Sequence, residues 1–140
     1  MESQERFYYP PPKDPRQLNP LTLAYLGDAL YEVFVRQYVI SQANYRPNHM
    51  HQMSTRFVSA KAQARALERL MSALTEEEAD VVKRGRNAKS GTTPKNTDVL
   101  VYRHSTAFEC LLGYLFFCGR HERLEELMRL SVERQDGSAF

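Results

Sequence analysis

Two acidic residues stand inside segments that otherwise have the apolar composition of buried helices. Asp28 lies within LAYLGDALYEVF, and Glu109 lies within STAFECLLGYLFF. An ionised carboxylate in a helical core is costly unless it is paired with a cation or binds a metal ion. One interpretation is that each acid reaches solvent or pairs with a basic residue such as Arg36, Arg103 or Lys61. The other interpretation is that the two acids act together.

A glycine lies close to each acid in the sequence. Gly27 directly precedes Asp28, and Gly113 follows Glu109. Because glycine has no side chain, two helices can approach closely at such positions, which would bring the two carboxylates together. Carboxylate oxygens presented in this way suit Mg²⁺, which takes one or two protein carboxylates beside substrate phosphates and keeps several waters. Asp28 and Glu109 are therefore the candidate catalytic and metal-binding residues.

Other catalytic chemistries find little support in the residue pattern. No Ser-His-Asp or Cys-His arrangement is evident. His49 and His51 are two residues apart, so they lie on different helical faces and lack the spacing of a zinc site. Cys110 and Cys118 lie in one helical segment, about 12 Å apart along the helix axis, which is too far for a disulfide. Both cysteines are predicted to be reduced core residues.

The net charge of +2 conceals a strong segregation of charge along the chain. Between Lys83 and Arg103, six basic residues oppose the single acid Asp98. Between positions 44 and 74, five basic residues oppose Glu68 alone. A half-basic surface of this kind predicts a polyanionic partner.

The segment 85–98 collects two glycines, a proline and many hydroxyl and amide residues, which indicates a functional loop. Such a loop suits phosphates and sugar hydroxyls, the groups through which an A-form RNA duplex is recognised by shape. His104, beyond the loop, is expected to be structural or to face RNA. The candidate RNA-binding residues are Arg84, Arg86, Lys89 and Lys95 in or beside the loop, and Lys61 and Arg65 before it, with short polar contacts from Ser90, Thr92, Thr93 and Asn96.

Apolar periodicity without strand alternation predicts an all-α fold. Asn19-Pro20 and a capping box from Thr75 to Glu78 mark two helix starts. The predicted bundle has about five main helices, at 21–40, 47–71, 76 to about 84–87, 99–118 and 122–134. A proline-rich arm at 1–16, extended or flexible, precedes one domain at 17–135, and a flexible tail follows at 136–140.

The composition of the 140-residue chain, with 42% hydrophobic and 26% charged residues, is that of one ordinary globular domain. No run of 18 apolar residues occurs, and the amino-terminal segment does not resemble a signal peptide. We therefore expect a cytoplasmic protein without a membrane partner. The helix at 21–40 is apolar nearly all round, so we expect neighbours on several sides and remaining apolar surface for an interface with a second copy.

Three segments resemble a known family. LAYLGDALYE resembles the signature helix of the ribonuclease III catalytic domain, and STAFECLLGYLF resembles its second acidic helix. RGRNAKSGTTPKNTDVLVYRHSTAFE resembles the loop and following helix of the Mini-III branch, which lacks a separate double-stranded-RNA-binding domain. The resemblance runs from about Asn19 to Arg134.

The resemblance implies a homodimeric, Mg²⁺-dependent endoribonuclease that cuts both strands of double-stranded RNA and leaves 5′-phosphate and 3′-hydroxyl ends. In it, Asp28 corresponds to the signature aspartate and Glu109 to the metal-binding glutamate. The implied substrate is the precursor of 23S ribosomal RNA, with a ribosomal protein as a further candidate partner. The alternative is a non-catalytic helical RNA-binding or ribosome-associated protein in which both acids are structural.

Two positions depart from the pattern of full-length ribonuclease III. That pattern has further acids where this chain has Ala24 and Thr106, so only two of the four family acids are present. Glu32, one turn after Asp28, is predicted to pair with Arg36 at the favoured i, i+4 spacing instead of joining the site.

Overall fold

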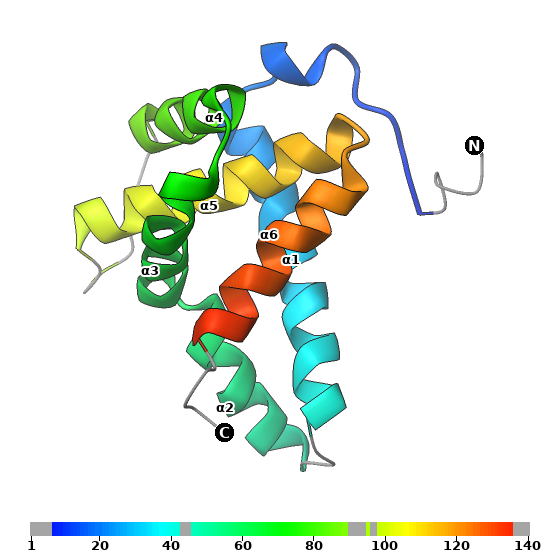
Figure 1. The fold of residues 1–140 in the computed structure, drawn as a ribbon, viewed down its shortest axis with the longest axis vertical. Helices are drawn as coiled ribbons and strands as arrows, with labels where there is room; N and C mark the ends of the chain where they lie inside the picture. Colours follow the sequence, from blue (N-terminus) through cyan, green and yellow to red (C-terminus); the bar gives the residue numbers. More distant parts are fainter. Residues whose placement is uncertain (1–6, 43–45, 90–94, 96–97, 136–140) are drawn as a thin grey trace.

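The structure is a computed structural model that describes residues 7–42, 46–89, 95 and 98–135. These residues form an all-α fold, as the sequence predicts (Figure 1). None of the described helices is both long and apolar enough to span a membrane. The helices are α1 (Pro20–Gln42), α2 (Pro47–Val58), α3 (Ala60–Leu70), α4 (Glu76–Asn87), α5 (Val99–Phe117) and α6 (His121–Gln135), with 3₁₀ turns at Pro15–Gln17 and Met71–Ala73.

Three helices begin at residues that cap them. The Asn19 side chain accepts a hydrogen bond from the Leu21 N–H at 2.8 Å, and Asp98 accepts from two N–H groups at the start of α5. Thr75 and Glu78 form the predicted capping box of α4, in which each side chain bonds to the backbone of the other. These caps satisfy N–H groups that have no partner within the helix.

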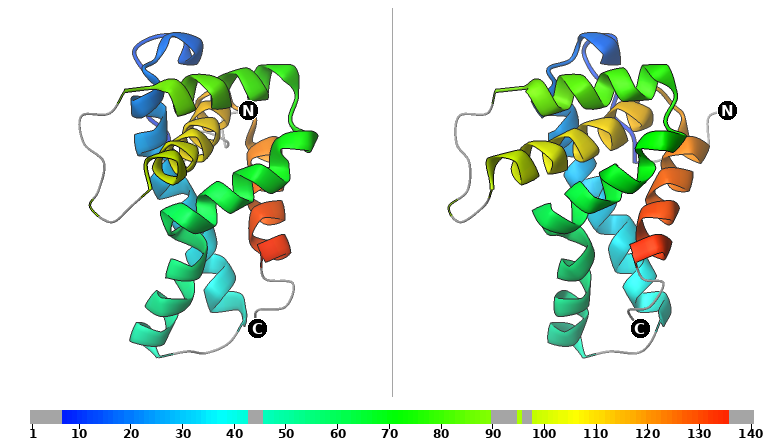
Figure 2. Two further views of the ribbon diagram at one scale, coloured as in Figure 1. Left: turned by 90° about the vertical axis from the view of Figure 1, so that its left-hand side faces the viewer. Right: turned by 60° about the vertical axis from the view of Figure 1, so that its left-hand side comes forward.

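Helix α5 is the central helix and crosses α1 at very short distance (Figures 1 and 2). Residues 107–115 are buried, apart from the half-buried Glu109. A Cβ atom added to Gly27 would lie 1.8 Å from the Glu109 carbonyl oxygen, and one added to Gly113 would lie 2.0 Å from the Leu23 carbonyl oxygen. Only glycine permits such a crossing, so the predicted close approach of the two helices is confirmed.

The core gathers around α5. The rings of Tyr31 and Phe108 meet edge to face, with centroids 4.9 Å apart. Cys110 and Cys118 are free thiols; Cys110 is buried and faces the Val81 carbonyl group of α4, and Cys118 is half-buried. Packing against α5 therefore orders both α1 and α4.

Helix α1 packs against α2, α4, α5 and α6 but keeps one face uncovered. Leu23, Tyr31 and Val35 are fully buried, whereas Tyr25 and Val33 on the outer face are 85% and 59% exposed. The prediction of neighbours on several sides is therefore confirmed. The expectation that apolar surface remains uncovered agrees with the structure.

The predicted single helix at 47–71 is wrong, because the chain breaks at Ser59 into α2 and α3 (Figure 2). The backbone of Ser59 is extended, with ψ of 155°, and its Oγ accepts a hydrogen bond from the Ala62 N–H at 3.2 Å. A serine hydroxyl that caps a new helix replaces the hydrogen bonds of a continuous one. The described residues consequently contain six α-helices where the sequence predicts about five.

The described part of the proline-rich arm contacts the domain. The ring of Tyr8 packs against Phe116 and Phe117, with centroids 5.8 and 6.4 Å apart, and Pro15–Gln17 forms a 3₁₀ turn before α1. Residues 1–6 of the predicted arm and the predicted tail at 136–140 lie outside the described residues.

Candidate active site

The crossing of α1 and α5 brings Asp28 and Glu109 together. Gly27, directly before Asp28, lies against the backbone of Glu109, and the two acidic side chains are close enough to interact. Asp28 is exposed and Glu109 is half-buried. The two carboxyl groups therefore form a pair that solvent reaches from the side of Asp28.

The surroundings raise the pKa of Glu109 to about 8. Burial disfavours its ionised form most strongly, and the Asp28 carboxylate adds repulsion and a hydrogen bond to the protonated form. A hydrogen bond with Gln63 acts in the opposite direction. At neutral pH and without a cation, Glu109 therefore favours its protonated form.

The basic side chains that the structure describes leave this pair without a salt bridge. Among the ion pairs formed by the described residues, none includes Asp28 or Glu109. Arg36 instead binds Glu32, with Nε 2.8 Å from Oε2, which confirms the predicted i, i+4 pair. Asp28 reaches solvent, as one half of the first interpretation expects, whereas neither acid forms an ion pair with Arg36, Arg103 or Lys61.

The chemistry of this pair fits a divalent cation. Ionising Glu109 beside Asp28 places two like charges together, and a hard cation bound by their oxygens offsets that repulsion. In the part of the chain that the structure describes, no third His, Cys, Asp or Glu completes a cluster of three. Ala24 is buried, and the Thr106 hydroxyl donates to the Tyr102 carbonyl oxygen at 3.0 Å. The remaining ligands of such an ion would therefore come from water and substrate.

Several basic residues that are distant in the sequence line one pocket. Lys61 and Arg65 of α3, Arg86 of α4 and His104 of α5 surround a hollow of about 500 Å³. Figure 2 shows α5 between α3 and α4, which explains why all three helices contribute. Apolar residues and one acid complete the lining, namely Ala64, Leu67, Met71, Val82, Val101 and Glu68. Three of the six candidate RNA-binding residues are thus brought together.

The other three candidates lie apart from that pocket. Lys89 lines a hollow of about 250 Å³ together with Tyr102, Arg103 and Thr106. Lys95 is exposed. The short polar residues expected to assist them, Ser90, Thr92, Thr93 and Asn96, lie outside the described residues.

Arg84 is engaged within the fold. Its side chain is half-buried and donates a hydrogen bond to the Leu18 carbonyl oxygen at 3.4 Å, across 66 positions of sequence. The bond links α4 to the segment before α1. A substitution at Arg84 would therefore disturb packing as well as any contact with RNA.

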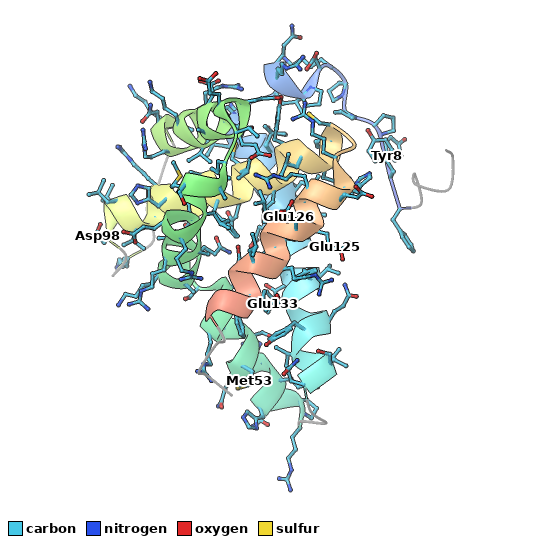
Figure 3. The ribbon with its side chains drawn as sticks, in the orientation of Figure 1. Tyr8, Met53, Asp98, Glu125, Glu126 and Glu133 are labelled. Atoms are coloured by element: carbon cyan, nitrogen blue, oxygen red, sulfur yellow. The ribbon has the colours of Figure 1, made fainter. Side chains whose placement is uncertain are left out.

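Three acidic side chains of α6 lie away from the basic pocket, and arginines of the same helix pair with them. Glu125, Glu126 and Glu133 project from α6, at a distance from the start of α5 at Asp98 (Figure 3). The basic pocket lies over α3, α4 and the first half of α5 instead. A polyanion would consequently meet the protein on the side of α3, α4 and α5.

Sequence reasoning did not identify Gln63, Tyr102 or Arg103 as parts of these sites. Gln63 is 1% exposed and contacts Glu109, and Tyr102 and Arg103 line the hollow that contains Lys89. The signal for Gln63 was available, since it is a lone amide on the face of α3 that also carries the buried Ala66 and Leu67.

Comparison with known proteins gives consistent matches over most of the chain. The family described as Ribonuclease III domain matches residues 21–120. The chain is 50% identical over 127 residues to a Mini-ribonuclease 3 of Brevibacillus brevis, covering 91% of this chain and 95% of that protein. It is 54% identical over 113 residues to a Mini-ribonuclease 3 of Staphylococcus aureus, covering 79% and 84%. A crystal structure of a Fusobacterium nucleatum protein superposes with a TM-score of 0.79 at 28% identity, covering 88% of this chain and 98% of that one.

Proposed function

This chain belongs to the ribonuclease III domain family, and from its similarity to Mini-ribonuclease 3 proteins we propose that it cleaves both strands of double-stranded RNA with Mg²⁺ held at Asp28 and Glu109. Membership of the family makes the chain an endoribonuclease. The proposed products carry 5′-phosphate and 3′-hydroxyl ends.

The observation that carries the proposal is the crossing of α1 and α5. There, Asp28 and Glu109 lie close enough for their carboxyl groups to interact, and no ion pair of the described residues neutralises them. A purely structural role explains the pair poorly, because ionising the half-buried Glu109 beside Asp28 is unfavourable unless a cation binds. When bound, Mg²⁺ activates a water and neutralises the charge that develops on the transferred phosphate. Asp28 and Glu109 hold and orient the ion.

The proposed RNA contacts are electrostatic. Lys61, Arg65 and Arg86 surround one pocket, and Lys89 lies in a neighbouring hollow on the other flank of α5. Lys95, Arg84 and the loop between α4 and α5 are further candidates from the sequence. Cations spread over this width suit the phosphates of a duplex more than the edge of one base.

Two copies of the chain are proposed to act together. A single chain supplies one Asp28–Glu109 pair, whereas cutting both strands of a duplex requires two pairs related by a two-fold axis. The outer face of α1 carries the exposed apolar residues Tyr25, Val33 and Ile40, and Asp28 lies on the same helix. A homodimer formed through this face would bury apolar surface and bring the two sites near each other.

The biological substrate is proposed from the same similarity. We expect the precursor of 23S ribosomal RNA to be cut in the cytoplasm, with a ribosomal protein as a candidate partner. Cleavage of that precursor in vitro, with and without ribosomal proteins, would test this part of the proposal.

The activity is tested with long double-stranded RNA in the presence and absence of Mg²⁺. Asp28→Asn and Glu109→Gln keep the shape of each side chain but remove an anionic oxygen, so each should abolish cleavage while retaining binding in a gel-shift assay. Glu32→Gln is the matched control on α1, because Glu32 pairs with Arg36, and it should cleave at close to the parental rate.

A protein that shifts the RNA without shortening it under any metal condition would support the non-catalytic alternative. If either Asp28→Asn or Glu109→Gln cleaved RNA at the parental rate, the substituted residue would not belong to the proposed site.

A further inference from the structure

Gln63 is a buried amide next to the acidic pair. Its side chain is 1% exposed, on a helix face whose other buried members are Ala62, Ala66, Leu67 and Leu70. Burying an amide costs free energy unless its polar atoms find partners. The partners of Gln63 therefore indicate what it does.

One partner fixes the orientation of the amide. The Nε2 atom of Gln63 donates to the Val58 carbonyl oxygen at 3.2 Å. Val58 is the last residue of α2, so its carbonyl group has no partner in a continuing helix. A carbonyl oxygen only accepts, so the nitrogen, and not the oxygen, of the Gln63 amide must point this way.

The second group that interacts with the Gln63 side chain is Glu109, on the helix α5 against which α3 packs. An amide nitrogen has two N–H groups, so one can bond Val58 while the other bonds Glu109.

The break between α2 and α3 makes this arrangement possible. Ser59 ends one helix and caps the next, so the Val58 carbonyl group is left available where α3 begins. Gln63 lies one turn into α3, where it reaches back to Val58 and across to α5. An uninterrupted helix would engage the Val58 carbonyl group with its own backbone.

We propose that Gln63 is a positioning residue for the metal site, which holds the Glu109 carboxylate towards Asp28 so that both can bind one divalent cation. This inference rests on the proposed metal-binding role of Asp28 and Glu109. Groups that orient metal ligands in this way typically change metal affinity by about 10- to 100-fold when they are removed. Gln63 would thus act on the ion through Glu109, without contact to the ion itself.

The test measures Mn²⁺ binding by isothermal titration calorimetry without RNA. Gln63→Met has a similar size but lacks both N–H donors, and it should weaken Mn²⁺ binding by about tenfold or more. Gln63→Asn keeps an amide on a shorter side chain and should lose less Mn²⁺ affinity than Gln63→Met. The same variants should need correspondingly more Mg²⁺ for half-maximal cleavage, yet approach the parental rate when Mg²⁺ is saturating.

Ser131→Ala is the control for a general loss of stability. Ser131 is also 1% exposed, and its hydroxyl bonds the Leu127 carbonyl oxygen within α6. This variant should lose thermal stability without changing Mn²⁺ affinity. If Gln63→Met does not fold, Gln63→Asn decides the question in the same assay.

The outcomes separate this inference from the proposed function. Parental Mn²⁺ affinity in the folded Gln63 variants, together with loss of binding in Glu109→Gln, would overturn the positioning role and leave the metal site intact. Parental Mn²⁺ affinity in Asp28→Asn and Glu109→Gln would overturn the metal site itself, and the positioning role with it.

Discussion

The half-buried carboxyl group of Glu109, beside Asp28, makes the stability of the metal-free protein depend on pH. Glu109 has an ordinary pKa of 4.5, which the folded surroundings raise to about 8. Between these values the folded state holds a proton that the unfolded chain has released, so the free energy of unfolding falls as pH rises. We expect the thermal midpoint of the metal-free protein to decrease between about pH 5 and pH 8.

Other shifted groups act outside this window. Glu77 and Glu78 have lowered pKa values, so their contribution is present above about pH 4.5 and is lost only in more acidic solution. Glu109→Gln should flatten the decrease, and Mg²⁺ should raise the midpoint most at the upper end of the range. If Glu109→Gln kept the parental slope of thermal midpoint against pH, another group would be responsible for the pH dependence.

Individual contacts differ in how far they could be predicted from the sequence. The Glu32–Arg36 pair and the cap at Thr75 depend on neighbours within four residues, so spacing alone predicted them. The contact between Asp28 and Glu109 was predictable because two glycines mark where their helices cross. The bond from Arg84 to Leu18 joins distant segments and leaves no local pattern.

At the scale of elements, two glycines are required for different reasons. Gly27 has no room for a Cβ atom, which would overlap the Glu109 backbone at 1.8 Å. Gly119, in the turn before α6, has open space but a φ of +74°. Gly27→Ala should therefore cost about 3 kcal/mol or more through overpacking, whereas Gly119→Ala should cost only about 1–2 kcal/mol through backbone strain.

Chemical denaturation of both variants measures this difference. Gly27→Ala should also separate α1 from α5 and so impair the Asp28–Glu109 pair, whereas Gly119→Ala should cleave RNA at the parental rate once folded. Equal stability losses would mean that the crossing can relax without cost.

The break at Ser59 illustrates the limit of periodicity for predicting elements. The apolar residues of 47–71 keep helical spacing across the break, so the two helices resemble one. The hydroxyl of Ser59 decides the outcome locally by capping α3. Gln63 has the Val58 carbonyl group as a partner only because of the break. Since the sequence did not predict the break, it did not predict the role of Gln63 either.

At the scale of the whole molecule, the uncovered face of α1 predicts association of two copies. Val33→Glu places a charge on this face and should convert a dimer to a monomer at micromolar concentration, as measured by analytical ultracentrifugation. Val99→Glu is the matched control, because Val99 is similarly exposed, at 50% against 59%, but lies on α5. A monomer should nick one strand where the dimer cuts both, and a parental protein that sediments as a monomer would exclude the proposed arrangement.

The basic pocket predicts how binding of double-stranded RNA depends on salt. Each phosphate contact that is lost should reduce the slope of log affinity against log salt by about 0.7 to 0.9, so replacing Lys61, Arg65 and Arg86 together by alanine should reduce it by about two or more. A matched pair on α4 separates specific contacts from net charge. Arg86 lines the basic pocket, whereas Lys83 lies beside Glu76 and Asp80.

Arg86→Ala should therefore flatten the salt dependence, and Lys83→Ala should leave it unchanged, although both remove one positive charge. Fluorescence anisotropy with a labelled duplex at several salt concentrations gives the slopes directly. Identical slopes for the two variants would mean that only the overall charge attracts the RNA. If the triple variant bound RNA as the parental protein does, we would infer that the duplex binds instead at the hollow lined by Lys89 and Arg103, on the other flank of α5.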